Sequence, residues 1–301
     1  LIFRYVFKNY LYRHFDERNV LYRYDSELGW FPLERSEGTF SASRTVSVTH
    51  NSDGFRDTEH GPKDRPRIAV LGDSFVWGFD VEQTERFTDR LDSALTDWDV
   101  MNMGVSGYST DQEFLLLRRF FDRYRPDIVL LVFCQINDEA DNTTNMIFEG
   151  YFKPYYTIEN GRLSLEGVPV QPSINYFYAQ YYDWTASYLV RGLARTYHWL
   201  VDPDHIRVPD PTYEIVSELN TYVTSRGAQF IVGLQDENAE LTRYMNEEGI
   251  DQLQLKNPHR YPAFGTHWTP AGHQEVSRRF LEYLSDGEYL IRTTQSEGHL
   301  Q

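Results

Sequence analysis

One serine in this sequence follows directly after a predicted buried strand. Ser74 comes after the run Arg-Ile-Ala-Val-Leu at 67–71, separated from it only by Gly72 and Asp73. In open sheets of parallel strands, ligands bind beyond the carboxyl ends of the strands. A serine hydroxyl at such an end can attack a carbonyl carbon once a base takes its proton. A Gly-Asp-Ser triplet is also common in turns, so this interpretation depends on partner groups elsewhere in the chain.

Three later positions supply such partner groups. The small residues Gly-Val-Ser-Gly at 104–107 follow a short predicted strand at 100–103, and their uncovered backbone N–H groups could hold an oxyanion. Asn137 follows the apolar strand at 128–133 and places a side-chain amide at the equivalent point. His267, shortly before the last predicted helix, supplies a base. A hydroxyl, a base and oxyanion donors together are what ester chemistry requires.

The elements that must position these groups alternate between strands and helices. The hydrophobic pattern predicts strands at 67–71, 100–103, 128–133 and 230–234, and helices at 84–95, 110–124, 211–225 and 270–284. Thr110 and Glu113 are expected to form a capping box at the start of the second of these helices. Alternating strands and helices favour a parallel sheet covered by helices on both faces. The sequence therefore predicts an α/β domain of three layers, α/β/α.

Two segments interrupt the alternation. Residues 1–66 are predicted to be an N-terminal lead-in that packs on the main domain, and 67–301 to be that domain, with an insertion at about 139–210. The insertion contains a predicted hairpin at 154–165 and an aromatic-rich helix at 175–201. The aromatic stripe of this helix could line a sugar- or acyl-binding cleft, although core packing or an oligomer interface is the commoner role.

Charge and cysteine content exclude several classes of partner. The chain carries 29 Lys and Arg against 45 Asp and Glu, a formal net charge of −16, and residues 1–66 are neutral, so the charge belongs to 67–301. Such a charge disfavours phosphate backbones, so no nucleic acid is expected as a partner. Cys134 is the only cysteine and the histidines show no ligand spacing, so no disulfide, metal or cofactor is expected.

The first residues leave the membrane question open. The longest apolar run, 128–134, is too short to span a bilayer and fits a buried strand. The segment Leu-Ile-Phe-Arg-Tyr-Val-Phe-Lys at 1–8 fits an amphipathic surface helix, or alternatively the end of a membrane anchor followed by basic residues. A membrane tether upstream of Leu1 is therefore one expectation.

Taken together, the four blocks resemble those of the GDSL or SGNH hydrolase family, which centre on Ser, Gly, Asn and His in this chain order. The residues that carry the resemblance are Gly72-Asp73-Ser74, 104–107, Asn137-Asp138, His267 and Gly272-His273. The resemblance covers about 67–284 and implies a flavodoxin-like sheet order. It also implies Ser74 as nucleophile, His267 as general base, and an oxyanion hole formed by the Ser74 and Gly107 N–H groups and the Asn137 side chain.

The family resemblance also implies a reaction and a location. The expected activity is that of a serine esterase that hydrolyses carboxylic esters, acyl or acetyl, through an acyl-enzyme on Ser74. Transfer of the acyl group to a sugar, as by a glycan O-acetyltransferase, is the alternative, because only the acceptor differs. Bacterial members with a similar lead-in are often envelope-associated, so the cell envelope is the expected compartment and an acyl ester or acetylated sugar the expected substrate.

One position departs from the family pattern. The family places a catalytic Asp three, sometimes two, residues before the His, where this chain has Phe264 and Gly265. Losing that carboxylate can weaken a triad by about ten-thousandfold. Three explanations remain open: a backbone carbonyl orients His267 in a dyad; a displaced acid substitutes, with Asp236 or Glu237 after the fourth strand as candidates; or the domain is non-catalytic and binds a glycan or lipid.

Overall fold

The computed structural model describes residues 21–148 and 150–292. These residues form two compact units, one of 21–33 with Thr143–Pro209 and the other of Glu34–Asn142 with 210–292. The expected lead-in is thus divided at Leu33 between the two units, and most of the expected insertion groups with 21–33. The interpretation of residues 1–8 falls outside the described part of the chain.

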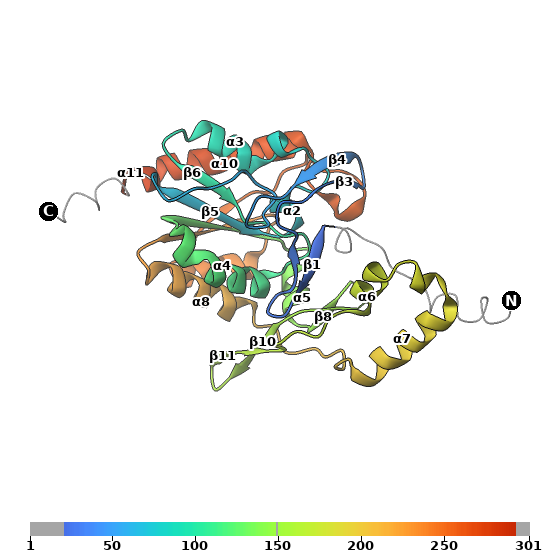
Figure 1. Ribbon diagram of the computed structural model, residues 1–301. Coiled ribbons are helices and arrows are strands. Elements are labelled where there is room, and N and C mark those ends of the chain that lie inside the picture. The colour runs from blue at the N-terminus through green and yellow to red at the C-terminus, as the bar shows by residue number, and fades with distance from the viewer. Residues whose placement is uncertain (1–20, 149, 293–301) are drawn as a thin grey trace. The chain divides into compact units, whose positions relative to one another are not determined.

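The larger unit contains a parallel sheet of five strands (Figure 1). Its strands are β5 (Arg67–Gly72), β6 (Asp99–Asn102), β7 (Ile128–Phe133), β12 (Gln229–Leu234) and β13 (Asp251–Gln254). Across the sheet their order is β13-β12-β7-β5-β6, which is the flavodoxin-like order 2-1-3-4-5 when the strands are numbered along the chain. The predicted three-layer α/β/α class with a central parallel sheet is therefore confirmed.

The neighbouring strands β5 and β7 are buried along their whole length, and apart from Arg67 at the start of β5 they carry no charged residue. Every residue of β5 and β7 is buried, and the strands pair in parallel from Ile68 opposite Ile128 to Gly72 opposite Val132. Continuous apolar runs are typical of strands with both faces covered. β13 was not predicted because its Asp-Gln-Leu-Gln sequence belongs to an edge strand that pairs on one side only and is partly exposed.

Helices cover both faces of this sheet, as Figure 1 shows, with α3 and α10 on one side and α4 and α8 on the other. The helices of the unit are α2 (Ser74–Trp77), η2 (Gln83–Glu85), α3 (Phe87–Ala94), α4 (Thr110–Tyr124), α5 (Asp138–Asn142), α8 (Thr212–Thr224), α9 (Ala239–Glu247), η4 (Phe264–Thr266), α10 (Pro270–Asp286) and α11 (Tyr289–Arg292). Leu91, Val276 and Phe280 of α3 and α10 belong to the main buried core with Ile68 and Val70 of β5.

The expected capping box at the start of α4 is wrong. Ser109 is the N-cap residue, and no side chain caps the helix there. The Thr110 hydroxyl oxygen and both carboxyl oxygens of Glu113 have no hydrogen-bond partner among the described residues. Glu113 is fully buried beside Asp73 and Asp138, so its side chain turns into the domain instead of back toward the helix end.

The smaller unit consists of short hairpins and helices. Its elements are β1 (Tyr22–Asp25), β2 (Gly29–Pro32), β8 (Met146–Ile147), β9 (Tyr151–Phe152), β10 (Tyr155–Glu159), β11 (Arg162–Glu166), α6 (Ile174–Gln180), η3 (Trp184–Ala186) and α7 (Tyr188–Val201). The predicted hairpin is confirmed as β10 and β11. The single helix predicted at 175–201 is wrong, because α6 ends at Gln180 with Tyr181 as its C-cap and α7 begins after the N-cap residue Ser187. No helix in the described ranges is long and apolar enough to cross a membrane.

A buried arginine fastens the loop that follows α2. Arg56 comes after the hairpin of β3 (Glu37–Ser41) and β4 (Thr45–Thr49). Its guanidinium donates to the carbonyls of Gly78 at 2.6 Å, Val81 at 2.9 Å and Ser47 at 2.7 Å. It also lies over the Trp77 ring, 4.8 Å from the ring centre. The loop from Trp77 to Val81 is therefore tied to the hairpin by one side chain.

We expect Arg56→Met to lower the free energy of unfolding by about 3 kcal/mol, because it leaves several buried carbonyls without a donor. Chemical denaturation followed by circular dichroism measures the change. The control is Arg278→Met on the exposed face of α10, where the ion pairs with Glu275 and Glu282 lie in solvent and contribute little to stability, so the loss should be much smaller. Equal losses in the two variants would contradict the role given to Arg56.

Candidate active site

Ser74 stands at the point where the strand order of the sheet reverses. β5 ends at Gly72, and the Asp73 carboxylate accepts the Phe75 N–H at 2.8 Å, which caps the N-terminus of α2. Ser74 is therefore the first residue of a short helix beyond the carboxyl end of β5. In a flavodoxin-like sheet the switch point lies between this strand and its neighbour β7, which is where such sheets bind ligands.

His267 contacts the serine directly. Its Nε2 lies 2.7 Å from the Ser74 Oγ, and its Nδ1 lies 2.5 Å from the backbone carbonyl oxygen of Phe264. A carbonyl oxygen can only accept a hydrogen bond, so Nδ1 carries the ring proton and donates it. Nε2 is then left with its lone pair facing the serine hydroxyl. This is the tautomer that can remove the hydroxyl proton.

A left-handed turn places the Phe264 carbonyl on the imidazole. Phe264, Gly265 and Thr266 have φ angles of 52°, 81° and 54°. A non-glycine residue in this region costs about 1–2 kcal/mol, so the surrounding structure must hold the turn. The Tyr261 N–H donates to the His267 carbonyl at 2.9 Å and so fixes the far side of the turn. A Cβ on Gly265 would come within 2.8 Å of the imidazole Cε1, so the turn also requires a residue without a side chain there.

Aromatic rings enclose the imidazole. The Phe79 ring stacks on it at 4.1 Å between centres with 19° between the planes, and the Phe75 ring lies at 4.8 Å. Burial lowers the pKa of His267 to about 4, while its hydrogen bond to the Phe264 carbonyl and the negative charge of Asp80 act in the opposite direction. At neutral pH the ring is therefore uncharged and able to accept a proton.

The structure does not bring either candidate acid to the histidine. Asp236 accepts a hydrogen bond from Arg260 at 3.0 Å. Glu237 is an exposed side chain paired with Lys256 at 3.3 Å. The position on Nδ1 that a catalytic carboxylate would take is occupied by the Phe264 carbonyl. Of the three explanations for the missing family Asp, the geometry matches the first, a Ser-His dyad oriented by a backbone carbonyl.

The sequence reasoning missed Asp80, an acid that acts on His267 by its charge. Asp80 is fully buried in the loop after α2, one residue beyond the stacked Phe79. One carboxylate oxygen accepts the Arg44 N–H at 3.2 Å, and the other has no hydrogen-bond partner in the described ranges. Its position six residues after Ser74, in the loop of the motif itself, is the signal that could have identified it.

The second sequence block runs against the helix that carries the serine. A Cβ on Gly104 would lie 2.5 Å from the Trp77 backbone nitrogen, so only glycine allows this approach. The Val105 N–H donates to the Gly72 carbonyl at 3.0 Å, which joins the block to the end of β5. Gly107, with φ of 80°, donates no backbone hydrogen bond to another described residue. Its N–H is therefore available to a bound group.

Asn137 reaches the same strand ends from β7. It lies just before α5, and its side chain hydrogen-bonds to the Asp73 carboxylate, the neighbour of Ser74 in sequence. Ser74 and His267 are in direct contact, and Asn137 reaches the residue next to Ser74, Asp73. The structure thus brings together three of the predicted site residues from segments far apart in the chain.

Three buried carboxyl groups lie beneath these residues. Burial raises the pKa of Asp73 to about 6, and it raises the pKa values of Glu113 and Asp138 well above their ordinary range, with the mutual charges adding to the rise. The Cys134 N–H donates to Asp138 at 2.8 Å. Sequence reasoning assigned Glu113 to a helix cap and so missed the cluster. Within 21–148 and 150–292, no three His, Cys, Asp or Glu side chains are arranged to hold a metal ion.

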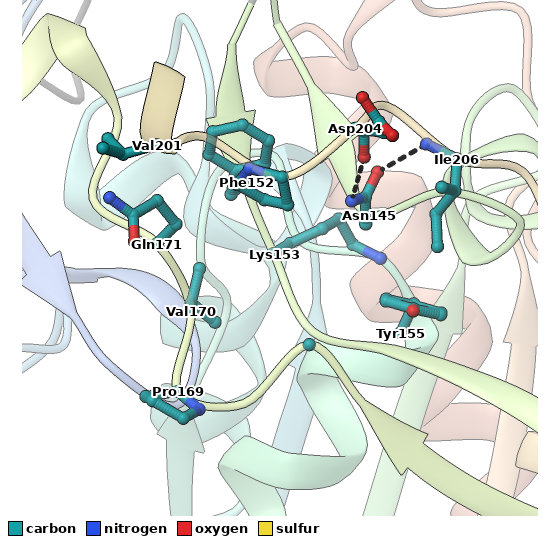
Figure 2. Close-up of a pocket in the computed structure, with 12 residues that line it drawn as sticks. Asn145, Phe152, Lys153, Tyr155, Pro169, Val170, Gln171, Val201, Asp204 and Ile206 are labelled. Carbon is teal, nitrogen blue, oxygen red and sulfur yellow. Dashed lines mark hydrogen bonds between the residues drawn. The ribbon is translucent and has the colours of Figure 1, made fainter. Parts of the chain in front are cut away.

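The smaller unit contains a cavity of about 400 Å³, shown in Figure 2. The buried Lys153 ammonium lines it and donates to the Thr144 carbonyl at 3.3 Å. Asn145 fixes one wall, because its side chain donates to the Asp204 carbonyl at 2.9 Å and accepts the Ile206 N–H at 3.0 Å. None of the site residues predicted from the sequence lines this cavity.

Comparison with known proteins bears on the fold. No protein-family model matches the sequence, and no curated protein matches it significantly. Among solved structures, TesA is 11% identical with a TM-score of 0.44, covering 73% of this chain and 98% of its own. A lipolytic protein of the G-D-S-L family from Veillonella parvula DSM 2008 is 13% identical with a TM-score of 0.42, covering 73% and 98%. The psychrotrophic esterase EstA from Pseudoalteromonas sp. is 10% identical with a TM-score of 0.41, covering 74% and 98%. At these identities the likeness is one of fold alone: the chain is similar in fold to G-D-S-L lipolytic proteins and esterases.

Proposed function

We propose that this protein is a serine esterase that hydrolyses carboxylic esters, acyl or acetyl, through an acyl-enzyme on Ser74. The observation that carries the proposal is the 2.7 Å contact between the Ser74 Oγ and the His267 Nε2. The Phe264 carbonyl on Nδ1 supports it, because it holds the imidazole in the tautomer that accepts a proton at Nε2.

In the proposed first half-reaction, the Ser74 Oγ attacks the ester carbonyl carbon and its proton moves to the His267 Nε2. The carbonyl oxygen becomes an oxyanion, and the N–H groups of Ser74 and Gly107 and the Asn137 amide are the donors proposed to stabilise it. The imidazolium then gives its proton to the alkoxide leaving group as the C–O bond breaks, and the acyl group stays on Ser74.

In the second half-reaction a water molecule takes the place of the alcohol. His267 removes one of its protons, and the hydroxide adds to the acyl carbon through a second oxyanion. Collapse of this intermediate releases the carboxylic acid, and His267 returns the proton to the Ser74 Oγ. The two half-reactions together consume one ester and one water molecule and regenerate the starting dyad.

The imidazolium formed in each step lacks a carboxylate partner. Its positive charge faces the dipole of the Phe264 carbonyl and the charge of Asp80, both of which favour the protonated ring. This support is weaker than that of a hydrogen-bonded Asp, so a slower enzyme than a full triad is expected. The net charge of −16 favours neutral substrates, such as acyl esters and acetylated sugars, over anionic ones.

We expect wild type to hydrolyse p-nitrophenyl acetate and to react with a fluorophosphonate probe at Ser74. Ser74→Ala abolishes labelling, and His267→Ala lowers kcat by about a thousandfold or more, because the two groups act as a unit. Asp236→Asn and Glu237→Gln, which leave the dyad untouched, are the matched controls and retain activity. Initial rates and mass spectrometry of the labelled protein measure these effects.

Other outcomes of this experiment decide against the esterase or against the dyad. Labelling at Ser74 with turnover only when a sugar acceptor is added identifies an O-acetyltransferase. A folded wild type that neither labels nor turns over the ester is a binding module. A large loss of activity in Asp236→Asn or Glu237→Gln leaves the esterase in place but contradicts the dyad, because it shows that a displaced acid takes part.

The pH profile tests the environment of the histidine. Because the base works only when uncharged and burial lowers the pKa of His267 to about 4, kcat/KM stays level on descending from neutral pH and falls only as pH approaches that value. Asp80→Asn removes a charge that raises this pKa, so the acid limb moves to lower pH. Stopped assays at constant ionic strength over a series of pH values measure the acid limb in wild type and in Asp80→Asn. An acid limb near the ordinary histidine value of about 6.5 would count against this environment.

Gly265→Ala tests the left-handed turn. The added methyl would meet the imidazole at 2.8 Å, and a displaced ring lowers kcat by about a hundredfold. The control is Gly249→Ala, because Gly249 has a similar φ of 66° but open space around its Cβ position. Both variants lose comparable stability through backbone strain, and only the first loses activity. Comparable kcat values in the two variants would show that the left-handed turn does not position the imidazole for catalysis.

A further inference from the structure

Helix α7 carries its apolar side chains on the outside. Leu189, Leu193 and Leu200 are 72%, 65% and 68% exposed, and at 100° per residue they fall on one face of the helix. On the opposite side Arg191 is only 8% exposed. A surface helix of a globular protein normally has the reverse arrangement. The apolar face of α7, defined here by these three leucines and Tyr197, is therefore a surface that faces outward from its own unit.

Aromatic side chains border this face at both ends. Trp184, just before the helix, and Trp199, in its last turn, are exposed, and so are Tyr181, Tyr182 and Tyr197. Tryptophan and tyrosine combine an apolar ring with a polar atom, which is why they gather at the level of lipid headgroups. Leucines flanked by exposed Trp and Tyr are the composition of helices that lie in a membrane interface.

The charge of the segment differs from that of the rest of the chain. Residues 188–201 contain no Asp or Glu, and 174–201 contain one acid, Asp183, against Arg191 and Arg195, while the whole chain has a net charge of −16. The face therefore lacks the carboxylates that cover the protein elsewhere. It complements a surface that is apolar and electrically neutral.

We propose that α7 docks this protein on a lipid bilayer, with its axis in the membrane plane and Leu189, Leu193 and Leu200 inserted among the acyl chains. A single convex helix face needs no complementary groove in a bilayer, whereas a protein partner would have to supply one. Binding comes from apolar burial, and the net charge opposes approach to anionic lipids. Neutral lipid is therefore the preferred surface, and added salt strengthens binding to anionic vesicles. The docking does not depend on the chemistry of Ser74.

Flotation of the full chain with phosphatidylcholine vesicles tests the proposal. Wild type is expected to float with the vesicles, and Leu193→Glu/Leu200→Glu is expected to weaken binding by about tenfold or more, because it places two charges in the inserted face. The matched control is Ile158→Glu in β10 of the same unit, which also replaces a partly exposed apolar residue and should bind as wild type does. Ser74→Ala should bind unchanged.

Tryptophan fluorescence supplies a second readout. Of the six tryptophans, Trp30, Trp77, Trp98 and Trp268 are buried, so a blue shift on adding vesicles reports on Trp184 and Trp199. Lipids brominated on the acyl chain should quench this emission, and Trp199→Phe should reduce the shift. Circular dichroism establishes that each variant is folded before its binding is compared.

Three results would overturn the proposal. The first is wild type that stays unbound with neutral vesicles. The second is binding that persists in the double glutamate variant, which would place the contact elsewhere in the chain. The third is a wild type that forms a dimer in light scattering and does not bind vesicles, together with a Leu193→Glu/Leu200→Glu variant that is a monomer. That result would make a second copy of the chain the partner of this face.

Discussion

The hydrogen bond from the His267 Nδ1–H to the Phe264 carbonyl is the interaction on which the rest of the site depends. It fixes which ring nitrogen faces the serine, and it does so without a charge. A neutral orienting group suits a ring that is buried between phenylalanines, because a carboxylate there would itself have to be taken out of water. The backbone of 264–266 meets this requirement with a strained turn.

The parts of the chain before and after the sheet converge on that ring. Arg56, from the segment ahead of the first strand of the sheet, holds the carbonyls of the loop that carries Phe79 and Asp80. Arg260, from the segment after the last strand, holds Asp236 and the Gln235 carbonyl. Because Phe79 of the first loop stacks on His267, the surroundings of the histidine depend on residues outside the four sequence blocks.

The sequence predicted the elements whose cause is local and missed those whose cause is tertiary. The predicted bounds of the strand at 128–133 and of the helix at 110–124 agree with the structure at both ends. A continuous apolar run and a helical periodicity are both visible in the sequence itself. The hydrogen bond between the Phe264 carbonyl and the His267 Nδ1 could not be predicted from the sequence. It depends on three successive residues in the left-handed conformation, and only Gly265 favours that conformation. Glu113 was misread because its spacing from Thr110 fits a cap equally well, and only the fold shows it buried.

The carboxyl cluster beneath Ser74 links the stability of the fold to protons. Burial raises the pKa of Asp73 from 3.8, its value in the unfolded chain, to about 6 in the fold, and it also raises the pKa values of Glu113 and Asp138. The folded protein therefore retains protons that the unfolded chain gives up as pH rises through this interval. Linkage then requires the free energy of unfolding contributed by these groups to be greatest below pH 3.8 and to fall as pH rises through about 6 and beyond. The cluster therefore contributes most to stability in acid below pH 3.8, where the His267 ring, with a pKa of about 4, is mostly protonated and cannot act as the base.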